Sequence, residues 1–221
     1  MDRVETIVAN RLAGTRLAGL DGMSEDEGYA LQARGNARLR EALGDPVGYK
    51  IGATTVAMRE LLRVEQPIAG EVFEKTVRRT PAVLRHADLV SPGIETEIAV
   101  RLGRDVPPSS TSHDRESIAR FVDAVMPAIE IVDNRYEVFR SAGAATFAAD
   151  NNFNAGSILG AECTEWRDLP LDALQTRTFI DGELKATALS DQLMGHPLDA
   201  LAWLAKRYGA YWAARSQPGR S

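Results

Sequence analysis

The sequence predicts an α+β fold, with helices and mostly antiparallel strands arranged in blocks. Apolar residues repeat with helical spacing near the N-terminus, and short β-rich segments broken by glycine and proline follow from residue 48. No regular alternation of strand and helix, which would indicate a parallel sheet, is visible. With 221 residues and 44% hydrophobic composition, the chain is long enough for one main domain with a helical N-terminal part.

The N-terminal 45 residues are predicted to form two helices. Apolar residues from Val4 to Leu12 recur with helical spacing. Ser24 and Glu27 form a capping box, which begins a second helix that runs toward Leu43. A short strand over 48–52, a helix over 57–64 and several strands over 68–102 are expected to follow.

The second half of the chain continues this pattern. A turn-rich loop at 107–113 leads into a helix predicted to end near Val125. The following stretch, 127–136, begins with an apolar segment that is typical of a strand. A further β region covers 151–160. The last predicted elements are a hairpin over 176–188 that turns at Asp181-Gly182 and an amphipathic helix over 195–207 with Pro197 in its first turn.

Composition excludes several classes of function. A formal net charge of −5 and a pI near 5.3 argue against a nucleic-acid partner, which would favour clustered Lys and Arg. Cys163 is the single cysteine, so an intramolecular disulfide and a zinc site built on thiolates are both excluded. The N-terminus lacks the apolar core of a signal peptide and no run has the length of a membrane span, so we expect a cytoplasmic protein without a membrane partner.

Two glutamates stand two positions apart in the β-rich stretch PGIETEIAV at 92–100. Because side chains of a strand alternate between its faces, Glu95 and Glu97 should lie side by side. Their repulsion is relieved either by water, as on an ordinary half-buried strand, or by a positive group between them.

Glu130 lies within the apolar stretch Ala-Ile-Glu-Ile-Val, where burial would require a partner for its charge. An arginine salt bridge is one alternative. Glu95, Glu97 and Glu130 together would make an all-oxygen site, which suits Mg²⁺ or Mn²⁺ better than zinc. Lys50 is flanked by glycines that let a ligand or another backbone come close, or it is a surface lysine. His196, beside a proline at a helix start, is a second candidate that also has a structural interpretation.

Five segments, taken in order, resemble one known family. They are GYKIGAT at 48–54, GIETEIAVRLGRDVP at 93–107, PAIEIVDNRY at 127–136, AADNN at 148–152 and GHPLDALAWLA at 195–205. The chain resembles the 2-keto-4-pentenoate hydratase and 4-oxalocrotonate decarboxylase branch of the fumarylacetoacetate hydrolase superfamily, from its N-terminal helices to about Lys206. The resemblance implies a mixed β-roll or sandwich in a single catalytic domain at 1–207.

The resemblance also implies a chemistry. Glu95, Glu97 and Glu130 would hold Mg²⁺ or Mn²⁺, and a 2-oxo acid would chelate the cation, which stabilises the enolate. Lys50 is the implied catalytic residue: it would neutralise the substrate carboxylate, or shuttle a proton if its pKa were lowered. Asp150, Asn151 and His196 are the implied substrate-binding residues. We expect a hydratase, with a decarboxylase and an acylpyruvate C–C hydrolase as alternatives.

Two departures from the family pattern bear on function. Typical hydratases of the branch carry an acidic residue after a Gln-Pro pair, whereas Ile68 follows Gln66-Pro67 here. Relatives also continue with further strands after the GHPL helix, whereas residues 208–221 show no strand pattern and are expected to be an unstructured tail. A truncated, non-catalytic relative is therefore a further alternative. Relatives commonly assemble, so a homo-oligomer is expected.

Overall fold

The computed structural model of the chain describes residues 2–20, 22–107, 113–137, 139 and 142–215. Two compact units are formed: the first from residues 1–97 and 127–161, and the second from residues 98–126 and 162–221. The N-terminal helices and most of the strands belong to the first unit. The second unit contains the predicted hairpin and the last helix.

The first unit combines helices with short strands. Its helices are α1 (Arg3–Ala13), α2 (Glu25–Leu43), α3 (Val56–Leu62) and α5 (Gly143–Ala149), with 3-10 turns η1 (Glu74–Thr76), η2 (His86–Asp88) and η4 (Asn151–Phe153). Its strands are β1 (Pro46–Gly52), β2 (Ile68–Phe73), β3 (Val77–Arg79) and β6 (Asn154–Leu159), together with parts of β4 (Pro92–Leu102) and β5 (Val122–Asp133), which continue into the second unit.

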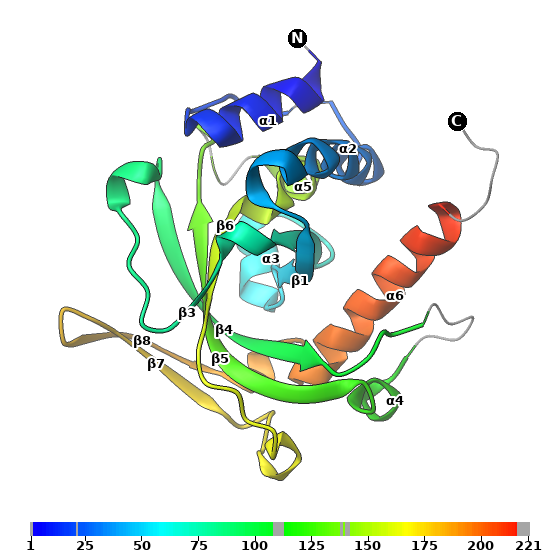
Figure 1. Cartoon of the computed structure of the whole chain (residues 1–221), viewed down its shortest axis with the longest axis vertical. Helices are drawn as coiled ribbons and strands as arrows, with labels where there is room; N and C mark the ends of the chain where they lie inside the picture. Colours follow the sequence, from blue (N-terminus) through cyan, green and yellow to red (C-terminus); the bar gives the residue numbers. More distant parts are fainter. Residues whose placement is uncertain (1, 21, 108–112, 138, 140–141, 216–221) are drawn as a thin grey trace. The chain divides into compact units, whose positions relative to one another are not determined.

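The two N-terminal helices form as predicted. Both arms of the capping box are present, because the Ser24 side chain accepts from the Glu27 N–H and the Glu27 carboxylate accepts from the Ser24 N–H. α1 lies against α2 (Figure 1). Val4 and Ile7 of α1 are buried in this contact with Leu31 of α2, so the apolar stripe seen in the sequence is the packed face.

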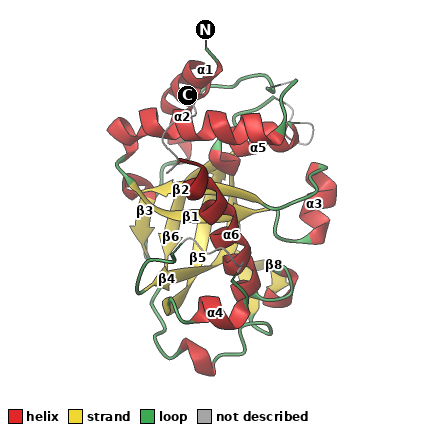
Figure 2. Cartoon of the chain, turned by 90° about the vertical axis from the view of Figure 1, so that its right-hand side faces the viewer, coloured by secondary structure: helices red, strands yellow, loops and turns green. Residues whose placement is uncertain are grey.

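The strands pair mainly antiparallel, as the α+β prediction requires. β1 pairs antiparallel with β2, with Lys50 opposite Gly70. A second sheet has the order β3-β6-β5-β4, in which β6 runs antiparallel to β5 and parallel to β3. α2 and α5 lie over β2 (Figure 2). Gly28 permits the close approach of α2 to α5, since a Cβ there would lie 2.4 Å from the Ala145 carbonyl oxygen.

An aromatic core fixes the segment that precedes β6. Tyr136 stacks on Phe153 with ring centroids 4.9 Å apart, and Phe147 of α5 lies 5.0 Å from the same ring. Leu62 of α3 and Ile68 of β2 complete this core. The end of α5 and the start of β6 are therefore held by buried side chains rather than by surface loops.

The second unit is built around a smaller core. Its elements are α4 (Arg115–Ala119), η5 (Trp166–Asp168), β7 (Gln175–Ile180), β8 (Glu183–Leu189), η6 (Ser190–Gln192) and α6 (Pro197–Arg215). β7 and β8 form the predicted hairpin, and Asp181 and Gly182 both have positive φ, at 53° and 82°. α4 lies beside α6 (Figure 2), where Arg115 pairs with Asp199.

Two sequence expectations are wrong. α4 ends at Ala119 rather than near Val125, because Val125 exchanges backbone hydrogen bonds with Cys163 and joins a strand. The helix α6 continues through Arg215, so residues 208–215 are not an unstructured tail; this alanine-containing stretch carries no proline and propagates the helix. Residues 216–221 lie outside the described residues. The single domain at 1–207 stays a prediction.

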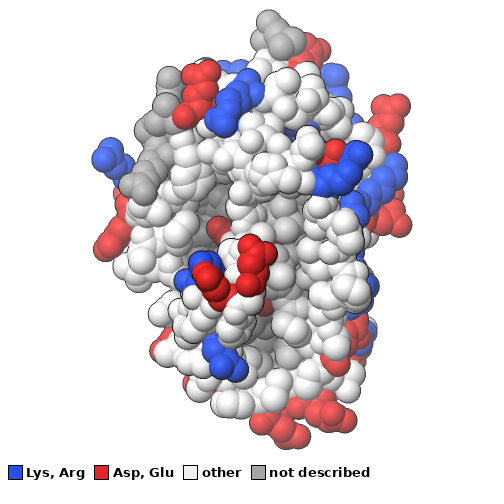
Figure 3. All heavy atoms as spheres, turned by 90° about the vertical axis from the view of Figure 1, so that its left-hand side faces the viewer, with Lys and Arg blue, Asp and Glu red and all other residues white. Residues whose placement is uncertain are grey.

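The longest helices of the described chain are α2 and α6, with 19 residues each. None of the helices in the described ranges is both long and apolar enough to cross a membrane. On the face shown in Figure 3, acidic and basic side chains are intermixed.

Candidate metal centre

Glu95 and Glu97 lie on one face of β4, as the two-residue spacing predicted. One carboxylate oxygen of each, together with one of Glu130 from β5, lies within 4.8 Å of the other two. Neighbouring strands of one sheet therefore bring together three residues that are up to 35 positions apart. Glu95 and Glu97 are partly buried, and Glu130 is buried.

Glu130 is held by a group at each of its two carboxylate oxygens. Its Oε2 lies 2.9 Å from Lys50 Nζ, and its Oε1 accepts a hydrogen bond from Asn154 Nδ2 at 2.9 Å. The buried carboxylate thus has the cationic partner that its apolar sequence context required. That partner is a lysine, whereas the sequence alternative was an arginine.

Only 8% of the Lys50 side chain on β1 is exposed, so its interpretation as a surface lysine is wrong. The second glycine of its motif is needed for protein packing. A Cβ on Gly52 would lie 1.6 Å from Asn152 Nδ2, so a larger residue there would displace the Asn152 side chain. Lys50 and the three glutamates are called the acidic cluster below.

Burial and the excess of acids shift the pKa values in the acidic cluster. Burial raises the pKa of Glu97 to about 8, with Glu130 and Glu95 adding to the shift and Lys50 opposing it. Burial likewise raises the pKa of Glu95 against the effect of Lys50. Burial alone would lower the pKa of Lys50, but Glu130 and Glu95 outweigh it and the pKa is raised.

These residues fit a divalent cation. Three carboxyl groups share a single ammonium group within the acidic cluster, and burial raises the pKa values of Glu95 and Glu97, so a cation would stabilise their ionised forms. The donor atoms are all oxygen, which suits Mg²⁺ or Mn²⁺. The protein groups are thus complementary to a hard cation.

Asp150 and Asn151, predicted to bind substrate, are both fully buried and contact the protein. Asp150 forms an ion pair with Arg135, and its Oδ1 lies 3.7 Å from Arg11 Nη1. Asn151 exchanges amide hydrogen bonds with Asn36 at 2.8 and 3.1 Å. Their contact with a substrate stays a prediction.

His196 precedes α6 in the second unit. Its Nδ1 accepts a hydrogen bond from the Leu198 N–H at 3.0 Å, which caps the first turn of the helix. Burial, together with Arg115, lowers its pKa. These contacts match the structural interpretation of His196, and its role in substrate binding stays a prediction.

Asn154 is the site residue that sequence reasoning missed. It is fully buried at the start of β6, and its amide reaches Glu130 on β5. The only signal in the sequence is a polar residue at the head of an apolar strand. That signal does not reveal which strand lies next to it.

Comparison with protein families gives one match. The profile described as Fumarylacetoacetate (FAA) hydrolase C-terminal matches residues 47–211. The chain is 33% identical over 177 residues to 2-hydroxyhexa-2,4-dienoate hydratase of Comamonas testosteroni, covering 79% of this chain and 66% of that protein. It is 32% identical over 185 residues to 2-keto-4-pentenoate hydratase of Paraburkholderia xenovorans, covering 83% and 67%. The chain thus spans about two thirds of the length of these relatives.

Solved structures give the same fold. 4-Oxalocrotonate decarboxylase from Pseudomonas putida G7, complexed with magnesium and adipate, superposes with a TM-score of 0.85 and 26% identity, over 97% of this chain and 80% of that one. Fumarylpyruvate hydrolase from Pseudomonas aeruginosa, in complex with Mn²⁺ and pyruvate, gives a TM-score of 0.54 at 13% identity, over 72% and 70%. The second similarity concerns the fold alone. The predicted mixed fold, with helices at the N-terminus, is confirmed.

Proposed function

Because the chain belongs to the fumarylacetoacetate hydrolase family, we propose that it is a metal-dependent lyase that hydrates a 2-hydroxy-2,4-dienoate. The observation that carries this proposal is the acidic cluster, with three carboxylates within 4.8 Å and Lys50 beside Glu130. The relatives at 32 and 33% identity are hydratases of such compounds, which supports this reaction type.

The proposed reaction adds one water molecule. For a five-carbon substrate, the water oxygen bonds to C4 and a proton is added at C5, while the proton of the 2-hydroxyl group is lost and one is gained at C3. The product is a 4-hydroxy-2-oxo acid. Negative charge spreads over the 2-oxo oxygen and the carboxylate as these protons move, so the site must stabilise an anion.

Glu95, Glu97 and Glu130 would hold the Mg²⁺ or Mn²⁺ ion, through the oxygens that already lie close together. When bound, the cation supplies Lewis-acid stabilisation of the developing negative charge. Burial raises the pKa of Glu97 to about 8, so binding of a cation by this carboxylate at neutral pH would release a proton.

Lys50 has the role of a protonated group. Its raised pKa keeps Nζ as an ammonium at neutral pH, which favours binding of the substrate carboxylate or donation of a proton, and disfavours a role as general base. Of the two roles that the resemblance implied, charge neutralisation is therefore the better supported.

Decarboxylation of a 4-oxalocrotonate is the second candidate. The superposition on 4-oxalocrotonate decarboxylase with a TM-score of 0.85 favours it. Ile68 favours it too, since it stands where the resemblance predicts an acidic residue in hydratases, and its side chain is fully buried in the core. No group at this position can transfer a proton.

The test follows ultraviolet loss of 2-hydroxypenta-2,4-dienoate, 4-oxalocrotonate and an acylpyruvate, each with Mg²⁺, with Mn²⁺ and with chelator. The proposal expects metal-dependent loss of the first compound, abolished in Glu97→Ala and retained in Glu183→Ala, a matched control on the exposed strand β8. Turnover of the second compound alone would establish the decarboxylase, and of the third alone a C–C hydrolase. No turnover in a folded, metal-binding protein would contradict all three.

The proposed partner is therefore a small 2-oxo acid.

Assembly into a homo-oligomer, expected from the resemblance, stays a prediction. Light scattering coupled to size-exclusion chromatography measures the mass of the particle, and a value of one chain mass, 24.1 kDa, would contradict it.

A further inference from the structure

We infer that Asn154 and Arg11 are positioning residues that fix the orientation of Glu130 for cation binding. Arg11, Asn154 and Glu130 are called the positioning relay below. This inference rests on the proposed metal site, and it adds a contribution from the N-terminal helix α1. That helix precedes residues 47–211, the part of the chain that the family profile matches.

The first contact of the relay joins Asn154 to Glu130. The Asn154 side chain is fully buried, and its Nδ2 donates to Glu130 Oε1 at 2.9 Å. Lys50 Nζ lies 2.9 Å from the other oxygen, Oε2. With a group at each oxygen, the carboxylate cannot rotate without losing a buried contact.

The chemistry of an amide suits this task. A carboxylate only accepts hydrogen bonds, so the Asn154 amide must present its NH₂ group to Glu130. The amide is neutral, so it orients Glu130 without cancelling the negative charge that attracts a cation. A second lysine at this position would instead compete with the cation.

Asn154 is itself held by an unusual backbone. The three residues before it, Asn151, Asn152 and Phe153, have positive φ of 51°, 49° and 62°, a left-handed conformation that asparagine tolerates and phenylalanine rarely adopts. The stacking of Phe153 on Tyr136 holds this left-handed turn in place. The turn delivers Asn154 to the first position of β6.

Arg11 provides the second contact of the relay. Its Nη2 donates to the backbone carbonyl of Asn154. The guanidinium is buried, and its other terminal nitrogen, Nη1, lies 3.7 Å from Asp150 Oδ1. Arg11 thus reaches from α1 to the residue that orients Glu130, and Asp150 compensates its charge.

The experiment measures Mn²⁺ binding to the full chain by electron paramagnetic resonance of the free ion, alongside thermal unfolding of the chelator-treated protein. Asn154→Ala and the isosteric Asn154→Leu are each expected to raise the dissociation constant about tenfold or more. Arg11→Met, which keeps an unbranched apolar stem and removes the guanidinium, is expected to raise it about threefold. Asn154→Leu and Arg11→Met keep the test valid if Asn154→Ala does not fold.

The matched control is Gln32→Ala. Gln32 is also buried in the first unit, where its Nε2 donates to the carbonyls of Ala69 and Ala148 and does not touch Glu130. The control should lower the unfolding temperature and leave the Mn²⁺ dissociation constant within about twofold of wild type. An equal loss of Mn²⁺ affinity in the control would overturn the relay, since general destabilisation would then explain the effect.

A double variant tests whether the two contacts act as one. If Arg11 acts through Asn154, Asn154→Ala combined with Arg11→Met weakens Mn²⁺ binding by less than the product of the single effects. If the Asn154 variants bind Mn²⁺ within twofold of wild type, the relay is overturned but the proposed metal site is not. A wild type that binds no Mn²⁺ would overturn the metal site, and the relay with it.

Discussion

The first unit buries two charged clusters that differ in their balance of charge. The arginine network consists of Arg11, Arg135, Asp133 and Asp150, with between 1 and 6% of each side chain exposed. The acidic cluster sets three glutamates against Lys50, and two of those glutamates are only partly buried. Two basic side chains meet two carboxyl groups in the first cluster, whereas one basic side chain meets three carboxyl groups in the second.

This difference in charge balance distinguishes a cluster that stabilises the fold from a candidate cation-binding site. In the arginine network each charge has an opposite partner, so its members can be buried together and hold α1 against the segment before β6. Burial lowers the pKa of Arg11 to about 10, and it stays charged at neutral pH. In the acidic cluster burial raises the pKa of Glu97 to about 8, with Glu130 and Glu95 adding to the shift, and a cation would stabilise the ionised carboxylate.

Breaking the balanced cluster should have the largest effect. Asp150→Ala leaves two buried guanidinium groups without their shared carboxylate, so the free energy of unfolding should fall by about 3–5 kcal/mol. Urea denaturation followed by circular dichroism measures this loss, and Asp150→Asn is the milder variant if the first does not fold. A loss below about 1 kcal/mol would show that the network is not structural.

Breaking the acidic cluster should act on cation binding rather than on stability. Glu97→Gln removes one metal ligand, so Mn²⁺ affinity should fall about 100-fold or more, while the unfolding free energy without metal, measured at pH 5, changes by less than about 1 kcal/mol. Titration calorimetry gives the affinity. Glu183→Gln, on the exposed strand β8, should bind Mn²⁺ like wild type; a parallel loss in this control would disprove the assignment.

The pH dependence of stability should also distinguish the acidic cluster from the arginine network. Because the pKa of Glu97 rises from 4.5 to about 8 on folding, the native state binds more protons than the unfolded chain between these pH values. The stability of the chelator-treated protein should therefore fall as pH rises through this window, by up to about 1.4 kcal/mol per pH unit. Glu97→Gln should flatten this slope in urea denaturation at pH 5, 6, 7 and 8; an unchanged slope would contradict the shift.

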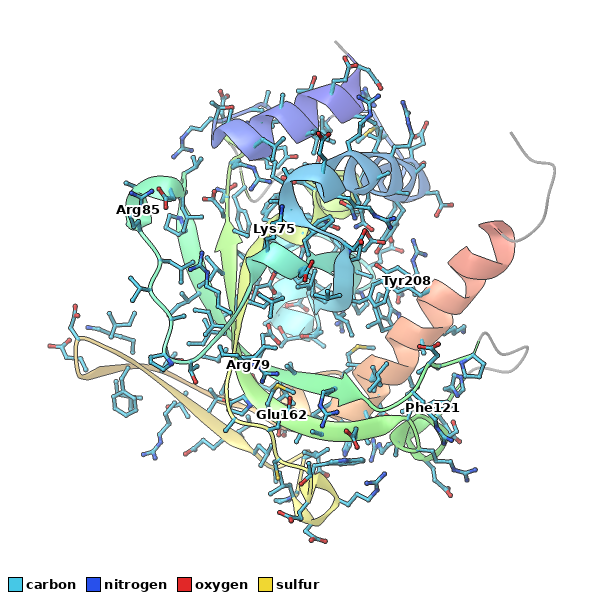
Figure 4. All side chains as sticks on the ribbon, viewed as in Figure 1. Lys75, Arg79, Arg85, Phe121, Glu162 and Tyr208 are labelled. Carbon is cyan, nitrogen blue, oxygen red and sulfur yellow. The ribbon has the colours of Figure 1, made fainter. Side chains whose placement is uncertain are left out.

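An exposed ion pair should contribute less to the free energy of unfolding than the buried arginine network. Arg85, labelled in Figure 4 on the segment of η2, pairs with Asp88 at 2.9 Å, and both side chains are more than half exposed. Arg85→Ala should change the unfolding free energy by less than about 0.5 kcal/mol, because solvent screens the pair. Thermal unfolding checks this value. A change as large as that of Asp150→Ala would mean that burial does not explain the difference between the clusters.

The sequence predicted the features that depend on neighbouring residues. The capping box of Ser24 and Glu27, the turn at Asp181-Gly182 and the shared face of Glu95 and Glu97 all follow from backbone periodicity, and each forms as expected. Predictions failed where a distant contact decided the outcome. Val125 joined a strand because Cys163 supplied its hydrogen bonds.

By itself, the sequence determined that Glu95 and Glu97 point the same way and that a buried Glu130 needs a partner. Only the tertiary structure decided that β4 and β5 bring the three glutamates together and that Lys50 of β1 is the partner of Glu130. It also decided that Asn154 contacts Glu130 and that Arg11 contacts Asn154. The reason is physical. Local geometry repeats every few residues along the chain, whereas the neighbours of a buried charge come from strands and helices whose pairing no local pattern encodes.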